Sequence, residues 1–484
     1  QKALTEYVDP IDAEKFVSAG LEEMMSVLDP YSIFMDESDK ENMEQLSSGK
    51  YGGIGAQLST RADTIIVIAP MEGAPAERVG LHSNDRIIAV NDENIVGKKL
   101  SKVAKQIRGE KGTDVELTVI RHGFGELNFT ITRDDVKLIN IPYAGFVDDG
   151  IGYIRVSRFS KTMTADFENE LEKMIPELKN GLILDLRGNP GGLLKSAIDI
   201  LDLFIPEGEL LLQTRGNLDT KIKEYFSQST PLISSDLPLV VLIDKGSASA
   251  SEIVSGVLQD IDRAVIVGEP SFGKGLVQRV FPLDRDHSIK LTTAKYYLPS
   301  GRLIQKIEYN DSAVILDSTE QEYFSENGRK MANKGGIEPD IKLEFPGGSA
   351  LALQLNQQGL FERFQNRIGD DFDAGKMWDI LEDSDFNWRD EHSKHLKFFT
   401  TEFDSLNADD QNALKILEER IAEKRLEKFS EETNIIERNF YQNLYLNRDG
   451  NEARYEFMVS TDEWVLKAIE ILKDEKKTTE LLHQ

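Results

Sequence analysis

Residues 239–261 read LVVLIDKGSASASEIVSGVLQDI, and their pattern sets the fold class of the surrounding region. The stretch opens on an uninterrupted apolar run, which is typical of a strand buried on both faces of a sheet. From Ser251 onward, apolar side chains recur at helical spacing and predict one buried stripe of a helix. The small residues between these two segments therefore form a tight strand-to-helix turn.

The composition indicates a globular protein and disfavours several classes of partner and chemistry. The chain has 484 residues, enough for two to four domains, and 40% hydrophobic with 29% charged residues is a globular composition. A formal charge of −28 disfavours nucleic acid and anionic membrane surfaces as partners. No apolar run is long enough to span a bilayer, and zero cysteines exclude disulfides and thiolate chemistry. Because the chain begins at Gln1, we expect a mature form whose targeting segment has been removed.

The pattern along the chain divides it into four regions. Residues 1–48 have helical spacing, with Pro30 expected to end the helix. Residues 49–135 consist of short β-like pieces separated by turns. Residues 136–345 alternate between strands and helices, as in an α/β layer structure, and residues 346–484 are charged and helix-patterned.

The serines of the opening turn have two interpretations. Each could be a helix N-cap, which is the ordinary role of a serine before a helix. Free amides at the start of a helix can also stabilise an oxyanion, so one serine could be a nucleophile. One cap needs one serine, whereas small residues fill this whole turn.

A serine nucleophile requires a base, and histidine does not supply an obvious one. In the α/β region the histidine is His287, in a polar stretch that predicts a hairpin turn. Lys274, in GEPSFGKGLVQ, has uncharged immediate neighbours. Burial and the absence of nearby carboxylates would keep such a lysine neutral, so we expect it to serve as the base.

Two other kinds of site are disfavoured. Gly268, Gly273 and Lys274 satisfy the spacing GxxxxGK of a nucleotide-binding loop, but Gly275 follows where Ser or Thr should hold Mg²⁺, and a strand follows instead of a helix. His392 and His395 could share a helix face but lack a third ligand. We therefore expect no metal and no other cofactor.

Several motifs occur in one order: YVDP, LDPYS, GGIGAQL, DLRGNPGG, SASASEI, SFGKGLVQ, YYLPSGRLIQ and GGIEPD. With them the sequence resembles the carboxyl-terminal processing proteases, the tail-specific serine peptidases of family S41, over roughly residues 5–345. The resemblance implies a multidomain α+β protein. A ClpP/crotonase-like α/β protease core at 136–345 would carry an inserted, mostly β PDZ domain at 49–135 and helical regions at 1–48 and 346–484.

The resemblance also assigns roles in catalysis. The nucleophile of the family motif falls on Ser249, the general base on Lys274, and a lysine-orienting amide on Gln278. Ser247 stands where the family usually has Thr. An oxyanion hole is implied from the amide of Ala250 and from a glycine amide of the DLRGNPGG loop, with Gly191 and Gly192 as candidates. The alternative for that loop is a glycine-rich turn without chemistry.

The PDZ resemblance implies a second site. Consecutive amides of a glycine-rich loop can collect a terminal carboxylate while the peptide adds as a strand. The residues of this loop are Gly52, Gly53, Ile54, Gly55 and Ala56. Leu58 and Ile107 are candidates for the pocket that takes an apolar last side chain. Arg108 could link the PDZ domain to the core, or could be an ordinary turn residue.

Two functions follow as hypotheses. The first is a serine endopeptidase that cleaves protein or peptide substrates at or near exposed C-termini. The second is a PDZ scaffold on a protease fold that has lost its chemistry. Ser249, Lys274 and Gln278 together favour the enzyme, because a scaffold needs none of them. The resemblance implies the periplasm of a Gram-negative bacterium, and the helical terminal regions could join copies into a homo-oligomer or hold substrate.

Overall fold

The structure is a computed structural model that describes residues 2–482 apart from 62, 72, 122, 218–221, 285–286, 307, 311–312, 316–321, 334, 345–348, 383–385, 387 and 389–407. The chain forms two compact units. Unit 1 comprises Gln1–Tyr51, Lys137–Phe345 and Ser460–Gln484, and unit 2 comprises Gly52–Val136 and Pro346–Val459. None of the described helices is both long and apolar enough to cross a membrane.

A six-stranded sheet forms the centre of unit 1, in the order β10-β11-β12-β15-β16-β23. Its strands are β10 (Tyr143–Asp148), β11 (Ile151–Arg155), β12 (Gly181–Asp185), β15 (Leu239–Ile243), β16 (Val265–Gly268) and β23 (Ile341–Lys342). Neighbours from β11 onward pair in parallel, and β10 is antiparallel to β11. The predicted apolar run is β15, and its five residues are all buried.

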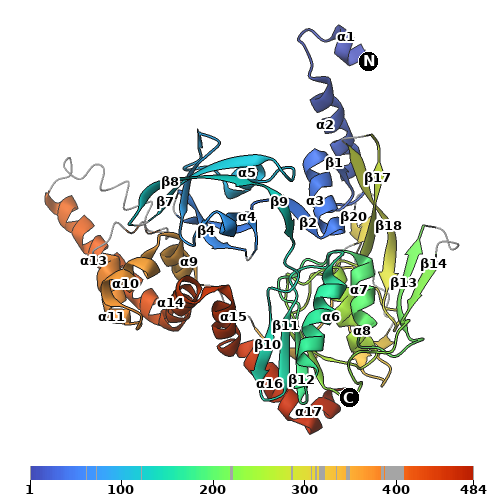
Figure 1. The fold of residues 1–484 in the computed structure, drawn as a ribbon. Helices are drawn as coiled ribbons and strands as arrows, with labels where there is room; N and C mark the ends of the chain where they lie inside the picture. Colours follow the sequence, from blue (N-terminus) through green and yellow to red (C-terminus); the bar gives the residue numbers. More distant parts are fainter. Residues whose placement is uncertain are drawn as a thin grey trace. The chain divides into compact units, whose positions relative to one another are not determined.

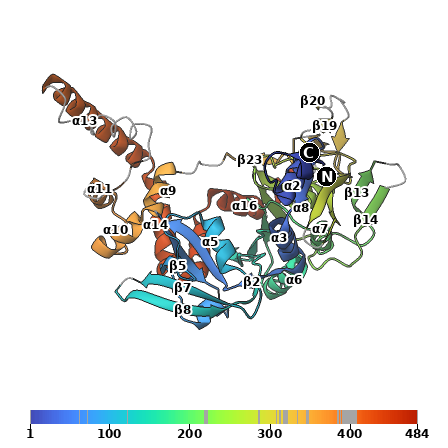
Figure 2. The ribbon, with the colours of Figure 1, turned by 90° about the horizontal axis from the view of Figure 1, so that it is seen from above.

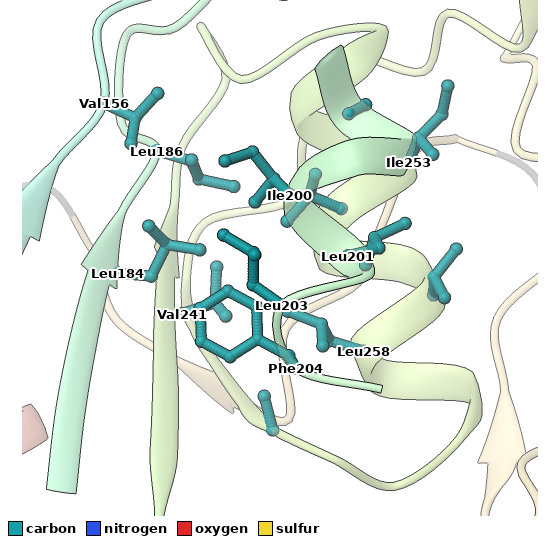
Figure 3. Close-up of a cluster of buried hydrophobic side chains, with 14 of the residues drawn as sticks. Val156, Leu184, Leu186, Ile200, Leu201, Leu203, Phe204, Val241, Ile253 and Leu258 are labelled. Carbon is teal, nitrogen blue, oxygen red and sulfur yellow. The ribbon is translucent and has the colours of Figure 1, made fainter. Parts of the chain in front are cut away.

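Three helices cover one face of this sheet: α6 (Met163–Met174), α7 (Leu194–Leu201) and α8 (Ala250–Asp260). Side chains from the helices meet alternate residues of the strands in one large apolar core. In Figure 3, Ile200 and Phe204 point from α7 and the turn after it toward Leu184 and Val241 of the sheet. This core fixes α8, and therefore the turn that begins it, against the end of β15.

The last part of the chain covers the other face of the sheet. Helix α16 (Glu463–Lys473) packs against β12, β15 and β16, and α17 (Glu475–Leu482) follows it, as Figure 1 shows. Trp464 is buried against Gly268, and Leu472 against Gly181. Because both faces are covered, the parallel strands are apolar throughout instead of alternating.

A second sheet in unit 1 joins the N-terminal residues to the core. It has the order β1-β18-β13-β14, with β17 pairing β18. Its strands are β1 (Ile33–Met35), β13 (Leu210–Gly216), β14 (Ile222–Phe226), β17 (Leu276–Pro282) and β18 (Ser288–Tyr297). The predicted hairpin at His287 is confirmed, since Leu283 N donates to the carbonyl of His287 between β17 and β18.

The N-terminal residues contain α1 (Lys2–Glu6), α2 (Ala13–Ser26) and α3 (Glu37–Ser48), and α2 and α3 pack against β1. Asp12 caps α2, which ends at Ser26, before the proline that we expected to stop it. The remaining short strands of the chain are paired as β2 (Lys50–Gly53) with β9 (Asp134–Lys137), β19 (Glu308–Asn310) with β20 (Ala313–Ile315), and β21 (Tyr323–Phe324) with β22 (Lys330–Met331).

The first segment of unit 2 is a small β domain with two helices. Its strands are β3 (Ala56–Arg61), β4 (Thr64–Pro70), β5 (Arg86–Val90), β6 (Glu93–Asn94), β7 (Asp114–Arg121) and β8 (Gly125–Thr132), and its helices are α4 (Pro75–Arg78) and α5 (Leu100–Ile107). The sheet order is β3-β4-β5-β7-β8, so β3 is an edge strand. A separate apolar core fills this domain.

Unit 2 also contains the helical C-terminal segment: α9 (Ala350–Gln357), α10 (Leu360–Ile368), α11 (Ala374–Glu382), α13 (Ala408–Glu431), α14 (Thr433–Arg448) and α15 (Gly450–Ser460). In Figure 2, α9, α10 and α14 lie together. Aromatic side chains form much of the core between them, including Phe361, Phe364 and Phe440. Arg61 of β3 pairs with Glu362 at 2.7 Å, and Asn84 bonds Asn447. The helical segment thus contributes to both units, because its last helices belong to the core.

Candidate active site

Ser249 lies at the turn between β15 and α8, in a backbone conformation that few residues adopt. Its φ is 56° and its ψ is −110°, so a residue with a Cβ occupies the left-handed half of the map immediately before the helix. Such outliers persist only where the surrounding structure enforces them, and they concentrate at functional sites. The side chain is half-buried, while Ala248 and Ala250 on either side are buried.

The neighbouring serines hold this turn against the glycine-rich loop. Ser247 Oγ donates to the carbonyl of Leu186, and Ser251 Oγ donates to the carbonyl of Asn189, both at 2.9 Å. Both serines are fully buried. The spacing of three serines thus has a physical explanation: the outer two fasten the DLRGNPGG loop and leave Ser249 at the exposed point of the turn.

One buried carboxylate connects Ser249 with Lys274. Glu252 Oε2 accepts hydrogen bonds from the backbone amides of Ser249 at 2.7 Å and Lys274 at 2.9 Å. Its Oε1 accepts from Ser271 Oγ and from the amide of Gly273, each at 2.6 Å. Burial raises the pKa of Glu252, and these four hydrogen bonds act in the opposite direction. Residues 25 positions apart in the sequence are therefore held side by side.

Tyr296 of β18 forms a second link between the same two residues. Its hydroxyl donates to the carbonyl of Lys274 at 2.6 Å and lies 3.4 Å from the carbonyl of Ser249. Burial, together with the charge of Glu252, raises the pKa of Tyr296 well above its ordinary value, so the hydroxyl keeps its proton and remains a donor. Glu252 thus binds the backbone amides of Ser249 and Lys274, and Tyr296 contacts their backbone carbonyls.

The surroundings of Lys274 lower its pKa, mainly through burial. The charge of Lys290 lowers it further, whereas Glu252 and Asp29 raise it. The sequence led us to expect no carboxylate near Lys274. That expectation is wrong, because the fold brings Glu252 and Asp29 close to the lysine from other segments of the chain. Among the described residues no carboxylate forms an ion pair with Lys274 Nζ, which lies 4.6 Å from the ring centre of Tyr31.

Gln278 lies on β17, in register with Thr292 of β18. Its amide nitrogen is 3.5 Å from Thr292 Oγ1, at the outer limit of a hydrogen bond. Within the described residues no hydrogen bond joins Gln278 to Lys274. Its role in orienting the lysine stays a prediction.

Of the candidate oxyanion donors in the glycine-rich loop, Gly191 lies against the nucleophile turn. A Cβ placed on Gly191 would meet Ala248 O at 2.6 Å and the Ala250 amide nitrogen at 2.9 Å, so only glycine fits here. The Gly191 amide donates to Asn189 Oδ1 at 2.9 Å, which occupies it in this state. Gly192 pairs with Phe159 in an isolated bridge.

The candidate peptide-binding loop of unit 2 leads into the edge strand β3. Ile54 is buried, its carbonyl accepts from the amide of Ala76, and the carbonyl of Gly55 accepts from Met71. Ile107 is also buried and Leu58 packs at the edge of the same core. The remaining loop residues are Gly52, Gly53 and Ala56, at the junction of β2 and β3.

Arg108 caps the C-terminal end of α5, where its amide donates to the carbonyl of Ala104. Its proposed link to the core stays a prediction. His392 and His395, the weak metal candidates, lie outside the described residues. Among the residues described, no group of three or more histidine or acidic side chains is arranged to hold a metal ion.

The sequence interpretation gave no role to three residues of this site, Glu252, Tyr296 and Tyr31. Glu252 had a usable signal, because Ser249 and Glu252 form the S-x-x-E spacing of a capping box, which places a carboxylate at the helix start. No signal in the sequence indicates that Tyr31 contacts Lys274, because the two residues belong to distant segments.

Comparison with known proteins matches two family models. Residues 150–311 match peptidase family S41, and residues 45–120 match the PDZ domain. A carboxy-terminal-processing protease of Bartonella bacilliformis is 36% identical over 328 residues, which cover 67% of this chain and 75% of that protein. The carboxy-terminal processing protease CtpA of Bacillus subtilis is 33% identical, with 74% of this chain and 76% of that protein covered.

This chain is also similar to two solved structures. A photosystem II D1 C-terminal processing protease is 24% identical, with a TM-score of 0.39, covering 71% of this chain and 85% of that chain. The PDZ domain of a carboxy-terminal protease from Vibrio cholerae, solved in complex with peptide, is 35% identical, covering 18% of this chain and 99% of that chain with a TM-score of 0.18. The two family models and the curated relatives confirm the expected family and the multidomain α+β fold. This chain belongs to the carboxy-terminal processing proteases and is a serine-type peptidase of family S41 with a PDZ domain.

Proposed function

We propose that this peptidase cleaves protein substrates at or near their C-termini, with Ser249 as nucleophile and Lys274 as general base. The observation that carries this proposal is the Glu252 carboxylate, one oxygen of which accepts from the amides of both residues. A serine at a strained helix start beside a half-buried lysine with a lowered pKa meets the requirements of a serine nucleophile and its base.

The reaction would proceed in two halves. Neutral Lys274 takes the proton of the Ser249 hydroxyl while its oxygen attacks the peptide carbonyl. The amide of Ala250 and a glycine amide of the loop stabilise the oxyanion. Lys274 then gives its proton to the leaving amine, and water hydrolyses the acyl-enzyme. Gly191 and Gly192 both stay candidates for the loop donor: Gly191 lies against the nucleophile turn, but its amide donates to Asn189 Oδ1.

The PDZ domain would bind the C-terminus of the substrate. Its glycine-rich loop precedes an edge strand whose second edge is unpaired in the described sheet, which is the arrangement that accepts a peptide as an added strand. The related Vibrio cholerae PDZ domain was solved in complex with a peptide, which favours a peptide ligand for this domain. The competing hypothesis, a scaffold without chemistry, predicts binding without cleavage.

The decisive experiment uses an unfolded test protein with an apolar, free C-terminus. Wild type should cleave it, and Ser249→Ala and Lys274→Ala should bind the tail without cleaving it. Amidation of the tail should weaken binding, because the amides of the loop then lose their carboxylate. Binding without cleavage by wild type would favour the scaffold, and unchanged cleavage by Lys274→Ala would remove the lysine from the mechanism.

We also propose association between copies and a periplasmic location. Helix α2 exposes large apolar side chains that no described residue covers: Phe16, Val17, Met24 and, just beyond the helix, Leu28. Light scattering of wild type and of Phe16→Ser/Met24→Ser tests whether this face joins two chains. The location rests on the family resemblance, and fractionation of the producing cells tests it.

A further inference from the structure

The loop between α2 and β1 brings an aromatic ring to the candidate base. The ring centre of Tyr31 lies 4.6 Å from Lys274 Nζ, within the range of a cation–π contact. This ring belongs to the LDPYS stretch, for which neither the sequence nor the proposed mechanism provides a role. Both residues belong to unit 1, so the contact lies within one compact body.

The loop that carries Tyr31 is held rigidly. Asp29 Oδ1 accepts from the amides of Tyr31 at 2.8 Å and Ser32 at 2.9 Å, and its Oδ2 accepts from Ser32 Oγ at 2.8 Å. An aspartate that closes its own turn in this way fixes the backbone two and three residues later. The backbone position from which the Tyr31 ring projects is therefore set by local hydrogen bonds.

The same loop is fastened to the strand that lines the site. Ser32 Oγ accepts from the amide of Thr292 at 3.1 Å, and β1 then pairs with β18, with Ile33 opposite Lys290. Thr292 is also the residue that the Gln278 amide approaches. The N-terminal segment is thus anchored to the elements that surround Lys274.

The charged groups that face Lys274 come from every element packed around it. Glu252 comes from α8, Asp29 from the loop, and Lys290 from β18, and the Tyr296 hydroxyl contacts the backbone of Lys274. No carboxylate in the described part of the chain is close enough to Nζ for an ion pair. The ring of Tyr31 is therefore the group on which an ammonium at this position would rest.

We propose that Tyr31 is a positioning residue that stabilises the ammonium of Lys274 during the reaction. This inference rests on the proposed Ser249/Lys274 mechanism. When the Ser249 oxygen bonds to the carbonyl carbon, its proton moves to Lys274 Nζ. The proton leaves Nζ again when the C–N bond of the substrate breaks and the amine departs. The ammonium exists between these two events.

An aromatic face suits this task better than a carboxylate. A carboxylate in contact with Nζ would hold the lysine permanently charged and remove its function as a base. The quadrupole of a ring attracts the cation more weakly, so the lysine can lose its proton in the free enzyme and still be stabilised when it gains one.

The test measures kcat/KM against pH for wild type, Tyr31→Phe, Tyr31→Leu and Tyr31→Met on a peptide with a free C-terminus. A fluorophosphonate that labels the nucleophilic serine gives a second rate, independent of the PDZ domain. Loss of the ring should move the acid limb of both profiles down by about 0.5 to 1 pH unit and lower the plateau several-fold. Tyr31→Phe keeps the ring and should match wild type.

Tyr297, on the strand β18 that also carries Lys290, offers a matched control. Tyr297 of β18 lies over Arg215, with the guanidinium carbon 4.1 Å from the ring centre. Tyr297→Leu removes an aromatic ring from a cation that has no part in the mechanism, so the acid limb should stay in place. Two ring-free variants of Tyr31 keep the test available if one of them does not fold.

Three results would overturn the inference. The acid limb of the pH profile could lie at the same pH in Tyr31→Leu and Tyr31→Met as in wild type. It could move to higher pH, which would indicate that water enters and that the ring acts only by excluding it. Tyr31→Phe could behave like Tyr31→Leu, which would transfer the role to the hydroxyl. Failure of wild type to react at any pH, or labelling that survives Lys274→Ala, would instead overturn the proposed mechanism itself.

Discussion

Glu252 Oε2 lies 2.7 Å from the backbone nitrogen of Ser249, at the first turn of α8. The same oxygen accepts from Lys274, so a single carboxylate determines the relative position of nucleophile and base. Both residues approach it through their backbones, which leaves their side chains available for the reaction. Because Glu252 is buried, the distance between the two backbones does not depend on a flexible surface contact.

Glu252→Gln should impair catalysis more than binding. An amide keeps one acceptor oxygen but presents N–H groups where the carboxylate accepted hydrogen bonds, so the two backbones should separate. Misplacement on the scale of 1 Å costs about 10²-fold in kcat, and KM should change little. Steady-state kinetics on a cleavable peptide measures both constants. Glu172→Gln, an exposed change on α6, is the control, and equal kcat values for the two variants would contradict the role of Glu252.

Gly191→Ala should abolish activity and weaken the fold. The φ of Gly191 is 97°, and a Cβ there would lie 2.6 Å from Ala248 O and 2.9 Å from Ser249 Cβ. Gly188 in the same loop has φ 67° with nothing within 4 Å of its Cβ position. Gly188→Ala should therefore show only the backbone cost of about 1–2 kcal/mol. Serine labelling and thermal unfolding of both variants separate the clash of the new Cβ, expected in Gly191→Ala alone, from the cost of a positive φ, which both variants share.

The pH profile should follow the protonation of Lys274. The lysine must be neutral to act, so kcat/KM should rise as pH passes upward through its pKa, which burial and Lys290 place below the ordinary value. Lys290→Gln removes the like charge, so the pKa of Lys274 should rise and the acid limb should move to higher pH by roughly half a unit. Lys195→Gln, which removes an exposed positive charge on α7, should leave the limb unchanged.

Trp464→Ala should destabilise the protease core. Trp464 is 3% exposed, packs against Gly268 and stacks under Arg187, whose guanidinium carbon is 5.3 Å from the ring centre. Loss of such a side chain costs about 3–5 kcal/mol. Leu466→Ala on the same helix changes a half-exposed residue and should cost less than about 1 kcal/mol. Urea unfolding of the two variants tests whether α16 is part of the core. Similarly small losses in the free energy of unfolding of both variants would show that it is not.

The local patterns predicted much of this molecule. An apolar run followed by small residues and a helical stripe predicted β15, the turn and α8, because burial on both faces and helical periodicity are properties of consecutive residues. The same reasoning predicted the alternation of strands and helices over residues 136–345 and the hairpin turn at His287. The motifs in their order identified the peptidase family and its PDZ domain before any coordinate was known.

The tertiary structure alone decided which distant segments meet. The sequence around Lys274 is uncharged, yet Glu252 and Asp29 face it from α8 and from the loop before β1. The ring of Tyr31 reaches the lysine only because β1 pairs with β18. Likewise, α16 has the pattern of any amphipathic helix, and its place on the central sheet follows from Trp464 filling the space above Gly268. Periodicity reports which face of a segment is buried, whereas the partner of that face is fixed by shape and hydrogen bonding between segments far apart in the chain.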